Sequence, residues 1–142
     1  MKSFLKLEVV WKDDDMFELE VTASDGQFSG TTEVYDGNGH LYKFANSLVG
    51  FPTTSDSILF YEAGEKDSYS YFSMKFYAID NVGHCGVQVT LESNVATEYR
   101  TEEKAKLTLE ILTEPGFLHS FIKSLLTLAT KEEGHATLEG LK

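Results

Sequence analysis

The chain has 142 residues, of which 42% are hydrophobic and 13% aromatic, a composition that is typical of a globular protein and excludes general disorder. Its 23 acidic and 12 basic residues give a formal net charge of −11, which makes nucleic acid and anionic membranes poor partners and a basic protein a natural one, unless the acidity serves solubility alone. With short apolar runs, no secretion-signal core near the start and one cysteine, the sequence predicts a single cytoplasmic domain, 1–142, in a bacterial protein.

Three strands are expected at the start of the chain, because apolar and polar residues alternate there with the period of two that a half-buried strand requires. The inward-facing residues of these strands are Leu5, Leu7, Val9 and Trp11, then Phe17, Leu19, Val21 and Ala23, then Phe28, Gly30, Thr32 and Val34. The loops between the strands are short, so the three strands should form an antiparallel meander.

The first hairpin has an acidic loop. If Asp13, Asp14 and Asp15 form a three-residue loop, Trp11 lies opposite Phe17 on the inner face, and Glu8 lies opposite Glu20 on the outer face.

The second hairpin contains an Asp-Gly pair at 25–26, the dipeptide that two-residue type I′ turns favour because both central residues need positive φ. This turn sets Ala23 opposite Phe28, which matches an apolar residue with an apolar residue. It also sets Glu18 opposite Glu33 on the outer face.

The middle of the chain predicts a short crossover helix followed by four more strands. The helix carries an apolar stripe and is stopped by glycine and proline: Leu41, Phe44, Ala45, Leu48, Gly50 and Pro52. The strands are expected within 57–64, 70–80, 85–93 and 105–112, with the charged segment 96–104 as a long connection or an edge extension. The inward residues of the last three strands are Phe72, Met74, Phe76, Ala78, Cys85, Val87, Val89, Leu91, Leu107, Leu109 and Ile111.

A C-terminal amphipathic helix follows, with Thr113 or Glu114 as its cap and Pro115 in its first turn. Its apolar stripe, which must dock on the sheet, is Phe117, Leu118, Phe121, Ile122, Leu125 and Leu128. Gly134 ends the helix, and the tail 134–142 is expected to be frayed. The fold class is therefore α+β: about seven antiparallel strands in a curled sheet or sandwich, with the two helices packed on it.

No residue pattern indicates a catalytic, cofactor-binding or metal-binding site, so we expect a protein that is not an enzyme. His84 and Cys85 are neighbours on a strand and point to opposite faces, so they cannot act as base and nucleophile. Cys85 continues an apolar face and should be buried and unreactive. The four histidines lack ligand spacing, and 13–15 lacks the glycine and glutamate of a calcium loop.

The outer face of the three-strand meander is the one candidate binding surface. Carboxylates there surround apolar and aromatic side chains, an arrangement that is typical of a protein-binding patch and that opposes like charges across strands. The candidate partner-binding residues are Glu8, Val10, Met16, Glu18, Glu20, Glu33 and Tyr35. The competing interpretation is an ordinary solvated surface whose charge Lys6 and Lys12 partly neutralise.

The order of short motifs resembles the WapI-type immunity proteins of bacterial polymorphic toxin systems and their uncharacterised relatives. The motifs are W-x-x-D, E-L-E-V and F-S-G in the meander, L-x-x-F-x-x-x-L in the crossover helix, and then G-V-Q-V, L-T-L-E-I and F-L-H-S-F-I-K-S-L. The resemblance implies a cytoplasmic, non-enzymatic protein that binds and silences a cognate toxin domain. The alternative is a small-molecule-binding β-barrel or sandwich with an aromatic-rich interior. The oligomeric state is left open.

Overall fold

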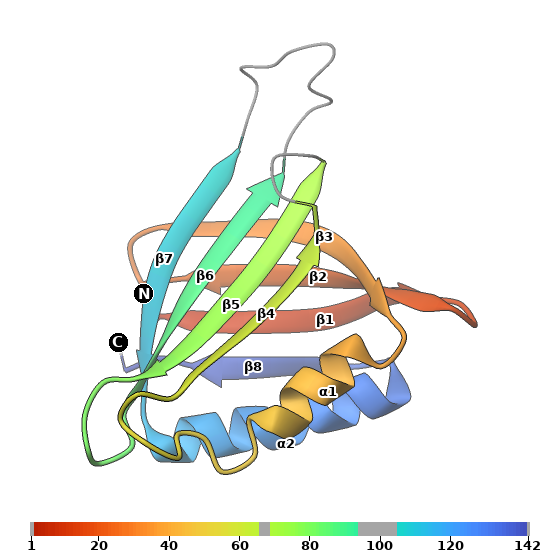
Figure 1. The fold of residues 1–142 in the computed structure, drawn as a ribbon. Coiled ribbons are helices and arrows are strands. Elements are labelled where there is room, and N and C mark those ends of the chain that lie inside the picture. The colour runs from red at the N-terminus through yellow and green to blue at the C-terminus, as the bar shows by residue number, and fades with distance from the viewer. Residues whose placement is uncertain (1, 66–68, 94–104, 142) are drawn as a thin grey trace.

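The protein forms two antiparallel sheets and two helices, which confirms the expected α+β class (Figure 1). This computed structural model describes residues 2–65, 69–93 and 105–141. The first sheet has the order β3-β2-β1-β8, with β1 Phe4–Lys12, β2 Met16–Ser24, β3 Ser29–Gly37 and β8 His135–Glu139. The second has the order β4-β5-β6-β7, with β4 Ile58–Gly64, β5 Ser70–Ala78, β6 Cys85–Ser93 and β7 Lys106–Thr113. The two sheets remain separate and do not close into a barrel.

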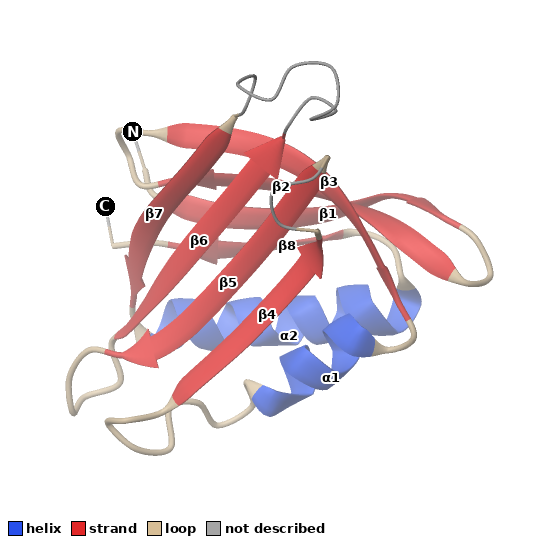
Figure 2. Cartoon of the chain, turned by 45° about the horizontal axis from the view of Figure 1, so that its top comes forward, coloured by secondary structure: helices blue, strands red, loops and turns tan. Residues whose placement is uncertain are grey.

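The strands of one sheet cross those of the other, and the two helices pack against each other on one side of the pair of sheets (Figure 2). These helices are α1, His40–Ser47, and α2, Pro115–Lys131. Buried side chains from both sheets and both helices form one continuous hydrophobic cluster. In its centre the rings of Phe76 and Phe121 stack with centroids 6.3 Å apart, so α2 is part of the core.

The first hairpin departs from the expected register beyond Val9. Glu8 lies opposite Glu20, as predicted, but a β-bulge after Val9 then pairs Trp11 with Glu18. The prediction that Trp11 faces inward opposite Phe17 is therefore wrong, and the Trp11 side chain is 46% exposed. The extra residue of the bulge reverses the face on which the following residues lie, because side chains alternate along a strand.

The second hairpin has a four-residue loop, 25–28, in place of the expected two-residue turn. The Asp25 carboxylate accepts the backbone N–H groups of Gln27 and Phe28, which stabilises the longer loop. Ala23 consequently pairs with Gly30 and not with Phe28, which is exposed. The shift is two residues, so the buried face of β3 is the predicted one.

The outer-face pairs change with this shift. Glu18 lies opposite Tyr35 and not opposite Glu33, so that prediction is wrong. Glu33 instead lies opposite Glu20, which the first hairpin already places opposite Glu8. Three carboxylates therefore stand side by side on neighbouring strands.

The crossover helix and the second sheet follow the sequence pattern. Leu41, Phe44, Ala45 and Leu48 are buried beneath the sheets, and Cys85 is fully buried in the inner face of β6 with its apolar neighbours. Among the predicted inward residues of the second sheet, Ala78 and Leu107 are only partly buried. The segment 96–104 lies outside the described residues.

The C-terminal helix docks as predicted, with Leu118, Phe121, Ile122, Leu125 and Leu128 buried and Phe117 partly buried. Glu114 occupies the N-cap position, although its side chain makes no capping hydrogen bond. The Thr113 hydroxyl instead donates to the carbonyl oxygen of Glu139, over 2.8 Å, and so joins β7 to the chain end.

The expectation of a frayed tail at 134–142 is wrong. After Gly134, with φ of 87°, the chain turns back and forms β8, an eighth strand that pairs with β1. Ala136 and Leu138 lie opposite Leu7 and Leu5, and all four side chains are fully buried. Burial of these side chains holds the end of the chain in the first sheet.

Candidate functional site

A row of three carboxylates and a histidine crosses the outer face of the first sheet. Pairing places Glu33 beside Glu20, Glu20 beside Glu8, and Glu8 beside His135, one residue from each of the four strands. Directly opposed side chains on an antiparallel pair have Cβ atoms only about 4.5–5.5 Å apart, so adjacent carboxylates in this row repel. The fold thus concentrates negative charge on one line.

An aromatic pair borders this row. Glu18 lies between Trp11 and Tyr35 in the strand register, and the two rings meet edge to face with centroids 6.1 Å apart. The pKa of Tyr35 is raised, chiefly by the Glu18 charge, and also by desolvation, by a hydrogen bond to Glu18 and by Glu33. Both aromatic side chains are about half exposed, so they remain open to a partner.

The two lysines that could neutralise this charge have different roles. The Lys6 ammonium lies 3.6 Å from the Glu8 carboxylate, as an exposed pair that contributes little to stability. Lys12 Nζ donates to the carbonyl oxygen of Lys131 over 3.2 Å, at the C-terminal end of α2, where a cation is favoured. In the described structure, Lys6 is therefore the one lysine that forms an ion pair with the row.

All seven predicted partner-binding residues lie on the outer side of the meander. Three form the row, Glu18 and Tyr35 form the next line, Val10 is the unpaired residue of the bulge, and Met16 lies opposite Gly37 near the hairpin tip. The sequence interpretation missed Trp11 and His135. An apolar run gives no signal of the bulge that exposes Trp11, and the sequence predicts that His135 lies in a frayed tail. We call Glu8, Val10, Trp11, Met16, Glu18, Glu20, Glu33 and Tyr35 the acidic face.

His84 and Cys85 do not form a reactive pair. The nearest partner of the His84 ring is Asp80, with 2.6 Å between Nδ1 and a carboxylate oxygen. Cys85 has no exposed surface, and burial, with a smaller effect of Asp80, raises the pKa of its thiol. Both effects suppress the reactive thiolate, which confirms that Cys85 is a core residue.

A second polar cluster joins the two sheets at the start of α1. The Tyr61 hydroxyl donates to the carboxylate of Asp36, which also lies 3.1 Å from His40 Nδ1. The Tyr61 and His40 rings stack with centroids 4.9 Å apart, and burial raises the pKa of the Tyr61 hydroxyl. Because Tyr61 is almost fully buried and each group has a partner, this cluster links β3, α1 and β4 and serves the fold.

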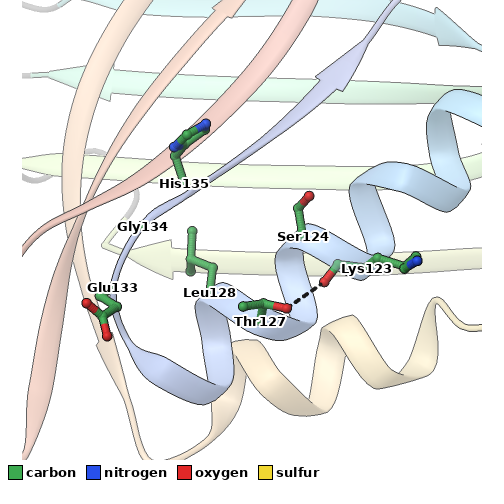
Figure 3. A pocket seen from close by; sticks show the side chains of 7 residues that line it. All are labelled: Lys123, Ser124, Thr127, Leu128, Glu133, Gly134 and His135. Atoms are coloured by element: carbon green, nitrogen blue, oxygen red, sulfur yellow. Dashed lines mark hydrogen bonds between the residues drawn. The ribbon is translucent and has the colours of Figure 1, made fainter.

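A shallow groove of about 280 Å³ lies between α2 and β8 (Figure 3). Ser124 and Thr127 face it from the helix and His135 from the strand, while the Thr127 hydroxyl donates to the carbonyl oxygen of Lys123 (Figure 3). The groove begins where the carboxylate row ends, at His135. In the part of the chain that is described, no three His, Cys, Asp or Glu side chains are grouped as metal ligands.

Comparison of the sequence with models of protein families found no match, and neither did comparison with curated proteins or with solved structures. Neither helix, within the described residues, is both long and apolar enough to cross a membrane.

Proposed function

We propose that this chain is a non-enzymatic protein-binding module, most concretely an immunity protein that binds and neutralises a basic toxin domain in the bacterial cytoplasm through the acidic face. The observation that supports this proposal best is the row of Glu8, Glu20 and Glu33, which are directly opposed across three strands and have one lysine partner among the described residues.

Stability alone does not favour such a row. Like charges directly opposed in a sheet are destabilising, whereas threonine or an alternating charge at the same positions would pair favourably. The neighbouring line of the same face shows this: the hydroxyls of Thr22 and Thr31 lie 3.1 Å apart across β2 and β3. A field of one sign raises the rate of encounter with a basic partner and repels acidic ones, which gives the row a use in recognition.

Trp11 and Tyr35 would be the central contact residues of this interface. Tryptophan, tyrosine and arginine carry much of the binding energy of protein interfaces. An arginine of the partner can stack on Trp11 while its guanidinium donates two hydrogen bonds to Glu18, which lies between Trp11 and Tyr35. Val10 and Met16 add apolar surface beside it. An apolar centre with a charged rim is the usual anatomy of such an interface.

The proposal that the partner is a toxin rests on the resemblance of the chain's motifs to immunity proteins. The proposed cytoplasmic site of action rests on the same resemblance. The rival function is small-molecule binding inside the sandwich. The interior offers it less support, because buried side chains of both sheets and both helices form one continuous cluster there.

The proposal predicts that a toxin domain is encoded beside this gene, and co-expression with that domain in bacteria tests it. We expect wild-type protein to restore growth, and Trp11→Ala combined with Glu18→Gln to restore it less well at equal protein levels. The control Asp56→Asn with Glu65→Gln changes two exposed carboxylates outside the acidic face and should behave as wild type. Absence of growth rescue together with absence of binding by calorimetry would contradict the proposal, and a small ligand seen in native mass spectrometry would favour the rival.

A further inference from the structure

The free edge of β4 lies on the second sheet, away from the acidic face. β4 pairs with β5 along its whole length, from Ile58 to Gly64, and within the described chain no other backbone hydrogen bond involves it. In an antiparallel pair, every second residue directs its N–H and C=O groups away from the partner strand. The free edge of β4 therefore presents a line of backbone donors and acceptors that can pair with another strand.

The other three sheet edges have contacts that hinder further pairing. Helix α2 packs beside β8. On β7, the carbonyl oxygen of Leu112 accepts the N–H of Leu141 over 2.8 Å. On β3, the Thr32 hydroxyl donates to the carbonyl oxygen of Glu92 over 2.7 Å, where β3 crosses the second sheet. β4 contacts α1 and β3, but within the described residues no hydrogen bond from an element other than β5 reaches its backbone. It also lacks the features that protect natural sheet edges against pairing, since it contains no lysine, proline or bulge.

The outward side chains of β4 are suited to burial. Ile58 and Phe60 are 61% and 50% exposed, and Ile58 lies opposite Tyr77 in the strand register. Glu62 carries the single charge of the strand, and its carboxylate accepts the Tyr71 hydroxyl over 2.7 Å. On a molecule with a net charge of −11, this strand is an apolar stretch that a second copy can approach.

We propose that β4 pairs with β4 of a second copy about a two-fold axis, which joins the two second sheets into one continuous eight-stranded sheet. A register centred on Phe60 sets Phe60 opposite Phe60 of the other copy, and Ile58 opposite Glu62. The two Glu62 residues are then about 14 Å apart along the strands, farther than the Debye length of about 8 Å at physiological salt. No like charges are directly opposed in this register.

The interface is small, because one seven-residue strand and two large apolar side chains per copy contribute to it. Such an area belongs to the weak, transient class of interfaces. The two copies also repel through their net negative charge, and salt screens this repulsion. The dimer should therefore form at high protein concentration and become stronger with salt, which is opposite to the salt dependence expected for a basic partner on the acidic face.

Sedimentation velocity over a micromolar to millimolar concentration series tests the pairing. Wild-type protein should shift toward the dimer as concentration rises, and further at high salt. Phe60→Lys should weaken association at least about tenfold, because the lysine places a charge at the centre of the interface. The matched control is Phe28→Lys, since Phe28 is 60% exposed in the loop of the first sheet. A wild-type chain that stays monomeric at high salt, or equal loss in both variants, would overturn the proposal.

A cysteine variant tests the register independently. Cross-strand Cα atoms about 4.5–5.5 Å apart fall in the range that a disulfide spans, so Phe60→Cys should oxidise readily to a covalent dimer. Phe28→Cys is again the control, and the native Cys85 is buried in both variants. Equal rates of cross-linking for the two variants would overturn pairing at Phe60. Either result leaves toxin binding by the acidic face to be tested separately, because that surface is on the other sheet.

Discussion

Glu20 is the central residue of the carboxylate row, with Glu8 on one side and Glu33 on the other. Glu18 is two residues away on the same strand and the same face, but it lies between Trp11 and Tyr35 and accepts a hydrogen bond from Tyr35. The two glutamates are thus both partly buried, but Glu20 has a carboxylate on each side and Glu18 has an aromatic ring on each side.

This contrast predicts opposite effects on stability. Glu20→Gln removes repulsion from two neighbours and should raise the free energy of unfolding by a few tenths to about 1 kcal/mol. Glu18→Gln, the matched control, should leave it unchanged or lower it slightly. Urea denaturation at low salt measures both, and the gain for Glu20→Gln should shrink as salt is added. A loss of stability in Glu20→Gln would show that the three carboxylates of the row do not destabilise the fold by repelling one another.

Trp11 is the chain's single tryptophan and reports on the bulge. Because its ring is half exposed and contacts Tyr35, emission should be at long wavelength and quenched by acrylamide in the native state. Trp11→Ala should cost less than about 1 kcal/mol, whereas Phe17→Ala, at a buried position, should cost about 3–5 kcal/mol. A protected, short-wavelength native emission would mean that Trp11 faces inward and that the bulge is absent.

At the scale of elements, the sequence predicts the strands and helices well wherever a periodic pattern is long. The period of two defines the buried face of β2, and the stripe from Leu118 to Leu128 defines α2, because each buries one face only. The hairpin registers are harder to predict, since an Asp-Gly pair fits both a two-residue turn and the four-residue loop that Asp25 stabilises. The sequence does not predict β8, because this strand is five residues long and contributes only two buried side chains.

The docked chain end predicts a large loss on truncation. Removal of residues 135–142 exposes the edge of β1 and leaves Leu5 and Leu7 without their neighbours on β8. Leu138→Ala should lower the free energy of unfolding by about 2–5 kcal/mol, as Leu125→Ala should in α2, because both side chains are fully buried. The exposed Thr137→Ala is the control, with an expected change within about 0.5 kcal/mol. An unchanged denaturation midpoint for Leu138→Ala would indicate a frayed tail.

At the scale of the whole molecule, the candidate site is partly predictable. Glu8 and Glu20 could be placed together from sequence, because the first hairpin keeps its predicted register as far as Val9. The three-residue row depends on the loop at 25–28, and its end at His135 depends on β8, which are both set by tertiary structure. The identity of the proposed partner cannot be predicted from the pattern of buried residues, because this core is formed without an interface to another chain.

The central proposal is that the acidic face attracts a basic partner. Stopped-flow association with the proposed toxin partner across a salt series tests it most directly. We expect the association rate to fall steeply with salt, and Glu8→Gln with Glu20→Gln to slow association most at low salt while folding is unchanged or improved. The control, Asp56→Asn with Glu65→Gln, removes the same charge elsewhere and should slow it much less. Equal effects of the two double variants, or a rate that does not depend on salt, would contradict a role for the acidic face in binding.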